Sequence, residues 1–527
     1  MRSFRCSVVL LALLPLLSCG DDPAPAPGGG SADGGDGTGD GDGTDGTDGA
    51  DGADGSDGTE DTGEPITWTD VPDRCDGDGP DGVDPFTLIG MVKNTEPAPW
   101  FTEILDLSVQ PETERVLTAG QGGVVVFDIA DPTDPITRDH IGAGGGSFSR
   151  YYHVWPASSD LAYATHREFG LDVLDVSDAD RLTRVTARNE RGYEGLAASD
   201  EHIYVASTDG FVDVWSIADP RDPRWVSRVE GLTRPWDVAL GAGVAYVADG
   251  TEGIVALSLA DPAAPTRAGT APSVGFPVRL TVHEDALYVV SGAGGLEIYD
   301  LSDPLAPTPL SQVDVGGSAL DVHVADGLVA VTTQEAVVLL DIGRAGSPGD
   351  PLPFAYEETE QYAMAVDSEA GTWAVGDWNI LGLWDVGEGP APALDLGKDV
   401  AAFLDGPGHV DVSMVNRGGA TLDLYGVDVP DGLTAQVSDL ALEPGQRGWI
   451  RLTWDGTTDV DDVRMCIASD DPGRPTQTLT VSTGNSGVGR VIGQQAPDFE
   501  LQDLDGNTYR LSEQAGHPVV LAYFATW

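Results

Sequence analysis

Five ionisable side chains stand on the expected first strands of a repeated unit. They are Asp106, His153, Asp237, Arg279 and Asp321. Mixed charges that converge in one place can bind a metal ion or a ligand, and a hydrolase would need polar groups to converge in this way. More commonly such side chains satisfy one another and water. We expect the five residues to line a common space with a structural role, and we assign no catalytic residue.

Metal and redox motifs are missing from the sequence. His153, His166 and His202 fall in neighbouring repeats, but their spacing does not recur as metal ligands do. The chain has four cysteines and no CxxC motif or Cys/His cluster with zinc spacing. We therefore predict no metal site and no cofactor.

The elements that must position these residues follow a repeat. Its clearest copy is Gly253–Pro265, an apolar run that ends in an acidic-proline corner. Close copies occur at Gly123–Pro135, Gly210–Pro223 and Gly295–Pro307, and looser copies end near Asp178, Gly343 and Pro392. The seven copies are 41 to 47 residues apart, which is the period of a four-stranded propeller blade. The sequence predicts a seven-bladed β-propeller over residues 84–392.

Each copy predicts three buried strands and an outer fourth strand. Asp followed by Pro suits a type I turn, and a second proline then begins the fourth strand, which places that strand at the sheet edge. A lone fourth strand, Asp84–Gly90, precedes the first blade. We predict that it completes the seventh blade, which ends near Val386, and so closes the ring.

The repeat resembles the LVIVD-repeat family of bacterial and archaeal surface proteins. The matching residues are Asp237-Val238, Ala245-Tyr246-Val247-Ala248 and the run Gly295–Pro304. The resemblance covers about 310 residues and implies a propeller without implying an activity. Blade two departs from the pattern at Asp178-Ala179-Asp180, and blades six and seven lose the Asp-Pro corner.

Residues 393–486 show short alternating strands separated by Gly, Pro and Asp turns, as in Val410–Gly418 and Cys466–Pro472. This pattern predicts an immunoglobulin-like β-sandwich, which would act as a spacer. The segment resembles choice-of-anchor and Hydin-like domains through Leu394–Gly397, Leu442–Gly445 and Ser469–Pro472. We expect Cys75 and Cys466 to be two unpaired thiols; the alternative is a disulfide between them, which would form if the chain is exported to an oxidising compartment.

Residues 1–18 read as an export signal, with two arginines before the apolar run Val8–Leu17. Leu16–Cys19 resembles the lipobox of bacterial lipoproteins, which implies cleavage before Cys19 and lipidation of that residue. An ordinary secretory signal is the alternative. Gly20 after the cysteine implies the outer membrane, facing the periplasm or the cell surface.

Residues 21–64 lack the apolar side chains needed for a core, and we predict a disordered tether over residues 19–83. Its many aspartates could hold divalent cations loosely. With 27 basic and 87 acidic residues the chain carries a formal charge of −60. This charge argues against a nucleic-acid partner, because such binding depends on neutralising phosphates.

Residues 487–527 contain Ala496–Leu501 and Val519–Trp527. They resemble the start of the redoxin branch of thioredoxin-like proteins, in which a catalytic CxxC follows the second motif. The expected fold class is thus all-β, a propeller and a sandwich, followed by an incomplete thioredoxin-like α/β fragment. The stop after Trp527 is expected to be a UGA codon for selenocysteine. A pseudogene or a sequencing error would also explain it.

Two functions follow from this organisation. The first is a lipid-anchored envelope protein whose propeller binds a protein or a glycan. The alternative is a membrane-tethered thiol or selenol oxidoreductase or peroxidase whose catalytic residues lie beyond Trp527. These 527 residues lack the attacking and resolving groups of thiol-disulfide exchange, so we expect no enzymatic activity from them as they stand.

Overall fold

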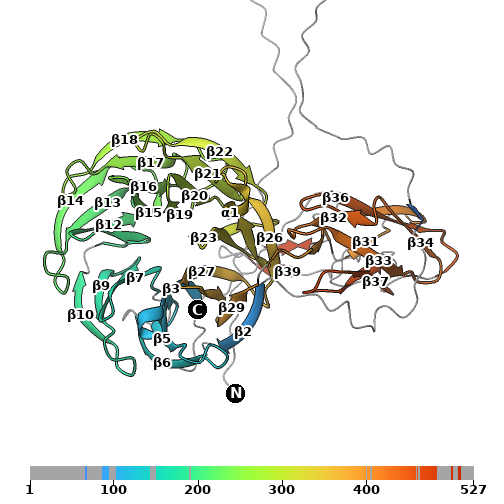
Figure 1. Ribbon diagram of the computed structural model, residues 1–527, viewed down its shortest axis with the longest axis horizontal. Helices are drawn as coiled ribbons and strands as arrows, with labels where there is room; N and C mark the ends of the chain where they lie inside the picture. The colour runs from blue at the N-terminus through green and yellow to red at the C-terminus, as the bar shows by residue number, and fades with distance from the viewer. Residues whose placement is uncertain are drawn as a thin grey trace, which may run out of the picture. The chain divides into compact units, whose positions relative to one another are not determined.

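The computed structural model describes residues 66–67, 86–93, 103–142, 150–188, 191–387, 389–398, 400–403, 406–458, 460, 463–482, 500–502 and 508–511. The described chain is built almost entirely from antiparallel β-sheets (Figure 1). It contains seven four-stranded sheets, two five-stranded sheets and one two-stranded sheet. Within these residues no helix is long and apolar enough to cross a membrane.

The seven four-stranded sheets are the blades of a propeller, whose first strands surround the centre of the ring in Figure 1. Blades one to three comprise β3 (Ile104–Gln110), β4 (Arg115–Gly120), β5 (Gly123–Asp128) and β6 (Ile136–Ile141); β7 (His153–Ser158), β8 (Leu161–His166), β9 (Gly170–Asp175) and β10 (Thr183–Arg188); and β11 (Leu196–Ala198), β12 (His202–Ser207), β13 (Phe211–Ser216) and β14 (Arg224–Glu230).

Blades four to seven follow in chain order. They comprise β15 (Pro235–Gly241), β16 (Val244–Asp249), β17 (Gly253–Ser258) and β18 (Thr266–Ala271); β19 (Arg279–His283), β20 (Ala286–Val290), β21 (Leu296–Asp300) and β22 (Thr308–Val313); β23 (Ala319–Ala325), β24 (Leu328–Thr333), β25 (Ala336–Asp341) and β26 (Leu352–Glu358); and β27 (Ala363–Glu369), β28 (Thr372–Asp377), β29 (Ile380–Val386) and β2 (Phe86–Lys93).

The inner strands are apolar along their whole length because both of their faces are buried. In β16, Ala245 and Val247 pack with blade three, whereas Tyr246 and Ala248 pack with blade five. Side chains alternate between the two faces of a strand, so one strand contributes to two cores. The outer strand β18 is largely exposed, as the position of the prolines predicts.

The tyrosine and the Asp-Pro corner of the repeat contact each other across neighbouring blades. The hydroxyl of Tyr204 in blade three donates to the carbonyl of Pro262 in blade four at 3.0 Å. Tyr246 donates in the same way to Pro304 of blade five at 2.9 Å. The hydroxyl of Tyr288 in blade five is buried without a partner. Blade six has the short helix α1 (Ile342–Ala345) in place of the corner, which explains this exception.

The ring closes by pairing the first propeller strand with the last. β2 pairs antiparallel with β29, with Phe86 opposite Val386 and Gly90 opposite Leu383. Phe86 is fully buried, and its ring stacks on Trp384 with centroids 4.7 Å apart. The predicted closure is therefore confirmed.

The segment after the propeller forms two sheets around one core. One sheet has the order β1 (Ile66–Thr67), β34 (Leu433–Val437), β36 (Arg447–Trp454), β32 (Gly408–Asn416) and β30 (Leu394–Leu396). The other has the order β31 (Val400–Ala402), β38 (Thr476–Ser482), β37 (Val463–Ser469), β33 (Leu422–Asp428) and β35 (Ala441–Leu442). The core between them includes Val412, Ile450, Ile467 and Leu479, all of which are fully buried.

Two features of this segment differ from the sequence expectation. Ile66 and Thr67, which we placed in the disordered tether, pair with Val437 and Gln436 and extend the first sheet. Cys466 on β37 is disulfide-bonded, so the expectation of an unpaired thiol is wrong for this residue. Its partner lies outside the described residues.

The segment that resembles a redoxin contains a short hairpin. β39 (Glu500–Gln502) pairs antiparallel with β40 (Thr508–Arg510). The apolar segment Val519–Trp527 lies outside the described residues.

Closure of the ring can be tested at Phe86. Phe86→Ala should lower the free energy of unfolding by about 3–5 kcal/mol, because it leaves a cavity beside Trp373 and Trp384. Leu88 lies on the same strand and is 41% exposed, so Leu88→Ala should cost less than about 1 kcal/mol. Urea denaturation measures both, and equal losses would contradict the role given to Phe86.

The contact between blades can be tested at two equivalent tyrosines. Tyr246→Phe should cost about 1 kcal/mol, since it removes a hydrogen bond and leaves the Pro304 carbonyl without its donor. Tyr288→Phe removes a hydroxyl that has no partner, and it should leave stability unchanged or slightly raised. A larger loss for Tyr288→Phe, measured by the same unfolding assay, would refute this account.

Candidate functional site

One position of the first strand recurs in every blade at the centre of the ring. Its occupants in blade order are Asp106, His153, Gly195, Asp237, Arg279, Asp321 and Ala365. In blades one, four, six and seven the pairing register shifts just before this position, leaving Leu105, Trp236, Leu320 and Met364 without a pairing partner. Such a bulge re-aims the following side chain. Gly195 is required by its neighbour, because a Cβ atom there would lie 2.1 Å from Oδ1 of Asp237.

Arg279 of blade five brings side chains from three other blades together. Its Nη1 lies 2.9 Å from Nδ1 of His153 and 3.9 Å from Oδ1 of Asp237, and its Nη2 lies 3.4 Å from Oδ1 of Asp106. The same Nη2 donates to the carbonyl oxygens of Leu105 and Tyr152 at 3.2 and 3.1 Å. We call Arg279, Asp106, His153, Asp237 and Asp321 the central cluster.

The three aspartates of the central cluster also join adjacent blades. Each accepts a hydrogen bond from a backbone N–H on the first strand of the next blade. The donors are Val154 for Asp106 at 2.7 Å, Leu280 for Asp237 at 3.2 Å and Val366 for Asp321 at 3.0 Å. These carboxylates therefore hold neighbouring first strands together around the centre.

Burial and charge shift the pKa values of the cluster. Burial raises the pKa of Asp106 to about 7 and that of Asp321 to about 6, although Arg279 opposes both shifts. Burial raises the pKa of Asp237 as well. For Arg279, burial would lower the pKa, but Asp106, Asp237 and Asp321 outweigh it and raise the pKa. Arg279 thus stays charged and supports the three carboxyl groups.

His153 is neutral in this environment. Burial and the nearby Arg279 lower its pKa to about 4. Because Arg279 can only donate, Nδ1 of His153 must accept, and the ring proton is on Nε2. Nε2 is buried and has no hydrogen-bond partner. Since Nδ1 already accepts from Arg279, His153 is not placed as a general base, and the cluster fits a structural clamp.

Sequence analysis missed a second contact at the centre. His323 and Asp367 stand two residues after the recurring position in blades six and seven. Nδ1 of His323 lies 2.9 Å from Oδ1 of Asp367, whose Oδ2 accepts from the backbone N–H of Val109 at 2.8 Å. Burial would lower the pKa of His323, but Asp367 outweighs it and raises that pKa. Aligning the repeats by the first-strand aspartate would have revealed both residues.

Sequence analysis also missed a row of aromatic and arginine side chains beside the cluster, which we call the rim. Its members are Tyr152, Arg167, Trp236, Arg234 and Phe276. Tyr152 and Trp236 directly precede the cluster residues His153 and Asp237 in sequence. An aromatic residue before the polar first-strand position was the signal available in the sequence.

His166 and His202, the other two histidines considered above as metal ligands, have structural roles. His166 is buried, and its Nδ1 accepts from the backbone N–H of Phe169 at 2.9 Å. His202 is buried at the start of β12 and lies near the ring of Tyr204. Across the described ranges, no three His, Cys, Asp or Glu side chains are grouped so that they could hold a metal ion.

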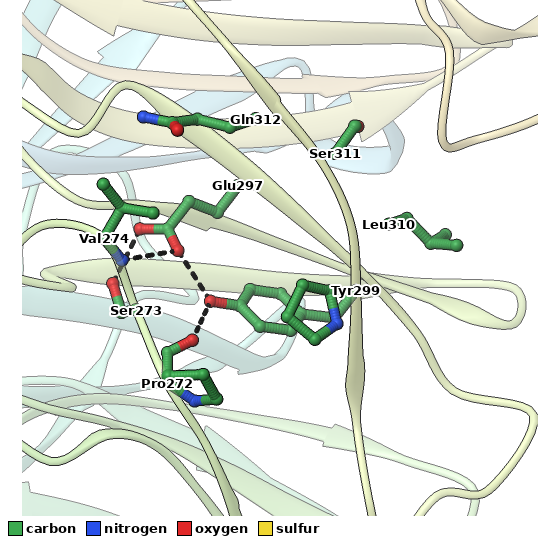
Figure 2. A pocket seen from close by; sticks show the side chains of 9 residues that line it. Pro272, Ser273, Val274, Glu297, Tyr299, Leu310, Ser311 and Gln312 are labelled. Carbon is green, nitrogen blue, oxygen red and sulfur yellow. Dashed lines mark hydrogen bonds between the residues drawn. The ribbon is translucent and has the colours of Figure 1, made fainter. Parts of the chain in front are cut away.

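A pocket of about 320 Å³ lies at the outer part of blade five (Figure 2). Glu297 in this pocket accepts hydrogen bonds from Ser273 Oγ at 2.6 Å, Val274 N at 3.0 Å and Tyr299 Oη at 2.7 Å. Burial alone would raise the pKa of Glu297, but hydrogen bonds from Ser273, Ser291 and Tyr299 lower it. The carboxylate is thus ionised and occupied by its donors, which fits a structural role better than catalysis.

Two family models match parts of the chain. Residues 278–315, which span blade five, match the LVIVD repeat, and residues 492–527 match the AhpC/TSA family. No curated protein shows significant similarity to this sequence.

Solved structures with a similar fold have low sequence identity. The RRP9 WD40 repeats are 13% identical with a TM-score of 0.45, covering 57% of this chain and 100% of that one. The WD40 β-propeller domain of Doa1 is 12% identical with a TM-score of 0.47, covering 58% and 98%. The computationally designed Ika8 protein is 10% identical with a TM-score of 0.41, covering 68% and 98%.

The shifted pKa of Asp106 predicts a pH-dependent effect of Asp106→Asn. The folded state holds this proton more tightly than the unfolded state, whose pKa is near 3.8. The protonated carboxyl of Asp106 therefore stabilises the folded state. This stabilisation is complete below about pH 4 and is lost as pH rises toward 7. His153 has the opposite effect over an overlapping range, because its pKa is lowered. As the pH rises from 4 to 8, the free energy of unfolding of Asp106→Asn should increase relative to that of wild type by on the order of 2 kcal/mol or more.

Denaturation at a series of pH values measures this change. Asp131→Asn is the control, because Asp131 is exposed and hydrogen bonds from Thr133 lower its pKa. Its difference from wild type should stay constant above about pH 4. A constant difference for Asp106→Asn as well would show that this carboxyl does not change protonation in the range.

Proposed function

We propose that this chain is a lipid-anchored bacterial envelope protein whose propeller binds a protein or a glycan. The export signal at residues 1–18 and the lipobox-like residues before Cys19 support the anchor. Several acyl chains on one cysteine make a stable anchor, whereas a single chain would be marginal. The proposed location is the outer membrane, facing the periplasm or the cell surface.

The observation that carries the binding role is the arrangement at the centre of the ring. The ionisable groups of the central cluster are used to join blades, and the rim beside them presents aromatic and guanidinium groups. Ligand sites combine apolar and aromatic surface with a few placed polar groups in this way. The sandwich would serve as a spacer with an immunoglobulin-like fold.

A second candidate rests on the AhpC/TSA match at residues 492–527. The redoxin resemblance implies a thiol or selenol nucleophile after the motif that ends at Trp527. The base sequence after codon 527 tests this candidate. A UGA codon followed by a thioredoxin-like reading frame would support a tethered oxidoreductase, and the read-through product should then reduce insulin or peroxide. A base sequence after codon 527 that does not encode the rest of a thioredoxin-like domain would remove it.

The anchor is tested by Cys19→Ala in a Gram-negative host. Wild-type chain should incorporate labelled palmitate and sediment with outer membranes, whereas the variant should incorporate none and remain soluble in the periplasm. Leu17→Ile, which changes the same motif without removing the acceptor thiol, is the matched control and should stay lipidated. Equal fractionation of wild type and Cys19→Ala would refute the anchor.

A further inference from the structure

The rim is an alternating row of rings and guanidinium groups across blades two, four and five. Cζ of Arg167 lies 4.3 Å from the ring centroid of Tyr152 and 5.4 Å from that of Trp236. Cζ of Arg234 lies 5.2 Å from the Trp236 ring and 5.9 Å from the Phe276 ring. Arginine is attracted to aromatic faces by the ring quadrupole. Each guanidinium is thereby held in place between two rings.

The two arginines of the rim differ in their ion pairs. Arg167 is neutralised by Glu194, to which Nη2 donates at 2.9 Å and Nε donates as well. Arg234 makes no ion pair and no side-chain hydrogen bond with any described residue, although its backbone N–H donates to Asp249. Asp249 is occupied by this N–H and by the backbone N–H and hydroxyl of Thr233. Among the described residues, the exposed guanidinium of Arg234 therefore has no hydrogen-bond or ion-pair partner.

Arg234 is thus a cation held between rings with no ion pair among the described residues, in a chain with a formal charge of −60. A guanidinium presents its donors in a planar fork that matches a carboxylate, and the resulting hydrogen bonds are stronger than neutral ones. The rings of Trp236 and Phe276 add apolar surface beside the cation. The ligand that fits these groups carries a carboxylate next to an apolar face.

The surroundings favour a sugar acid over a protein. The exposed large apolar side chains of the propeller stand mostly on outer strands, away from the rim: Leu88, Ile89 and Met91 on β2, Ile136 on β6, Val185 on β10, Trp225 on β14, Leu310 on β22 and Leu352 on β26. Leu305 stands on the corner before β22. Val274 stands on the segment that also carries Phe276 of the rim, and Tyr362 stands just before β27 in blade seven. A protein interface of standard size has a buried apolar core, whereas a sugar ring needs only a few aromatic and polar groups such as those of the rim.

We infer that the rim binds an acidic oligosaccharide through a uronate carboxylate held by Arg234. The apolar face of the sugar packs against Trp236 and Phe276. This inference rests on the proposed binding role of the propeller and assigns that role a site and a ligand class.

Binding of hexagalacturonate to the full-length chain tests the inference, by isothermal titration calorimetry at about 0.15 M salt, where long-range charge effects are largely screened. Arg234→Gln should weaken binding at least about tenfold, because it removes a charge-assisted hydrogen bond. Arg234→Lys keeps the charge but loses the planar fork, and it should give an intermediate loss.

The matched control is Arg267→Gln on the outer strand of the same blade. It removes the same charge from an exposed arginine that pairs with Glu252, and it should change affinity less than twofold. The fully methyl-esterified hexasaccharide should not bind measurably, since it lacks the carboxylate. Equal losses for Arg234→Gln and Arg267→Gln would show diffuse attraction and overturn the site.

Two further outcomes separate this inference from the proposed function. If hexaglutamate binds as tightly as hexagalacturonate and depends equally on Arg234, the ligand class is an acidic peptide and the sugar assignment is wrong. If neither probe binds but a neutral glycan or a protein binds with no effect of Arg234→Gln, the rim assignment fails and the binding role survives. If a panel of glycans and peptides shows no binding, both proposals fail.

Discussion

The propeller depends on the pairing of β2 with β29. The two strands are almost 300 residues apart in sequence, yet they form neighbouring strands of one sheet. Without this pairing the seventh sheet would have three strands, and β29 would expose an unpaired edge. The position of every blade therefore depends on the pairing of β2 with β29. The residues at the centre of the ring are brought together only when this pairing has formed.

Two sets of hydrogen bonds then fix each blade against the next. Near the centre, aspartates such as Asp106 accept from the backbone of the following blade. Further out, tyrosines such as Tyr246 donate to the corner of the following blade. The repeat carries both groups because each blade meets its neighbour in the same way. The buried hydroxyl of Tyr288 shows what happens when one partner is replaced, here by α1.

The central cluster and the rim use their charged side chains in different ways. The Arg279 guanidinium interacts with buried carboxyl groups, two of which have pKa values of about 6 and 7. The charged groups of the cluster therefore interact with one another. The rim is different, because Arg234 is held by rings and leaves its donors available. The buried cluster joins neighbouring blades, whereas an exposed cation of fixed position is suited to recognition.

The repeat alone determined the number of blades, the order of their strands and the closing partner of Phe86, because each blade must bury the same apolar pattern. It also placed the central residues on first strands. Only the tertiary structure decided which of them meet, because Arg279 reaches residues that are far away in sequence. The rim, the pairing of Ile66 with Val437 and the disulfide at Cys466 likewise depend on long-range contacts, which local patterns do not encode.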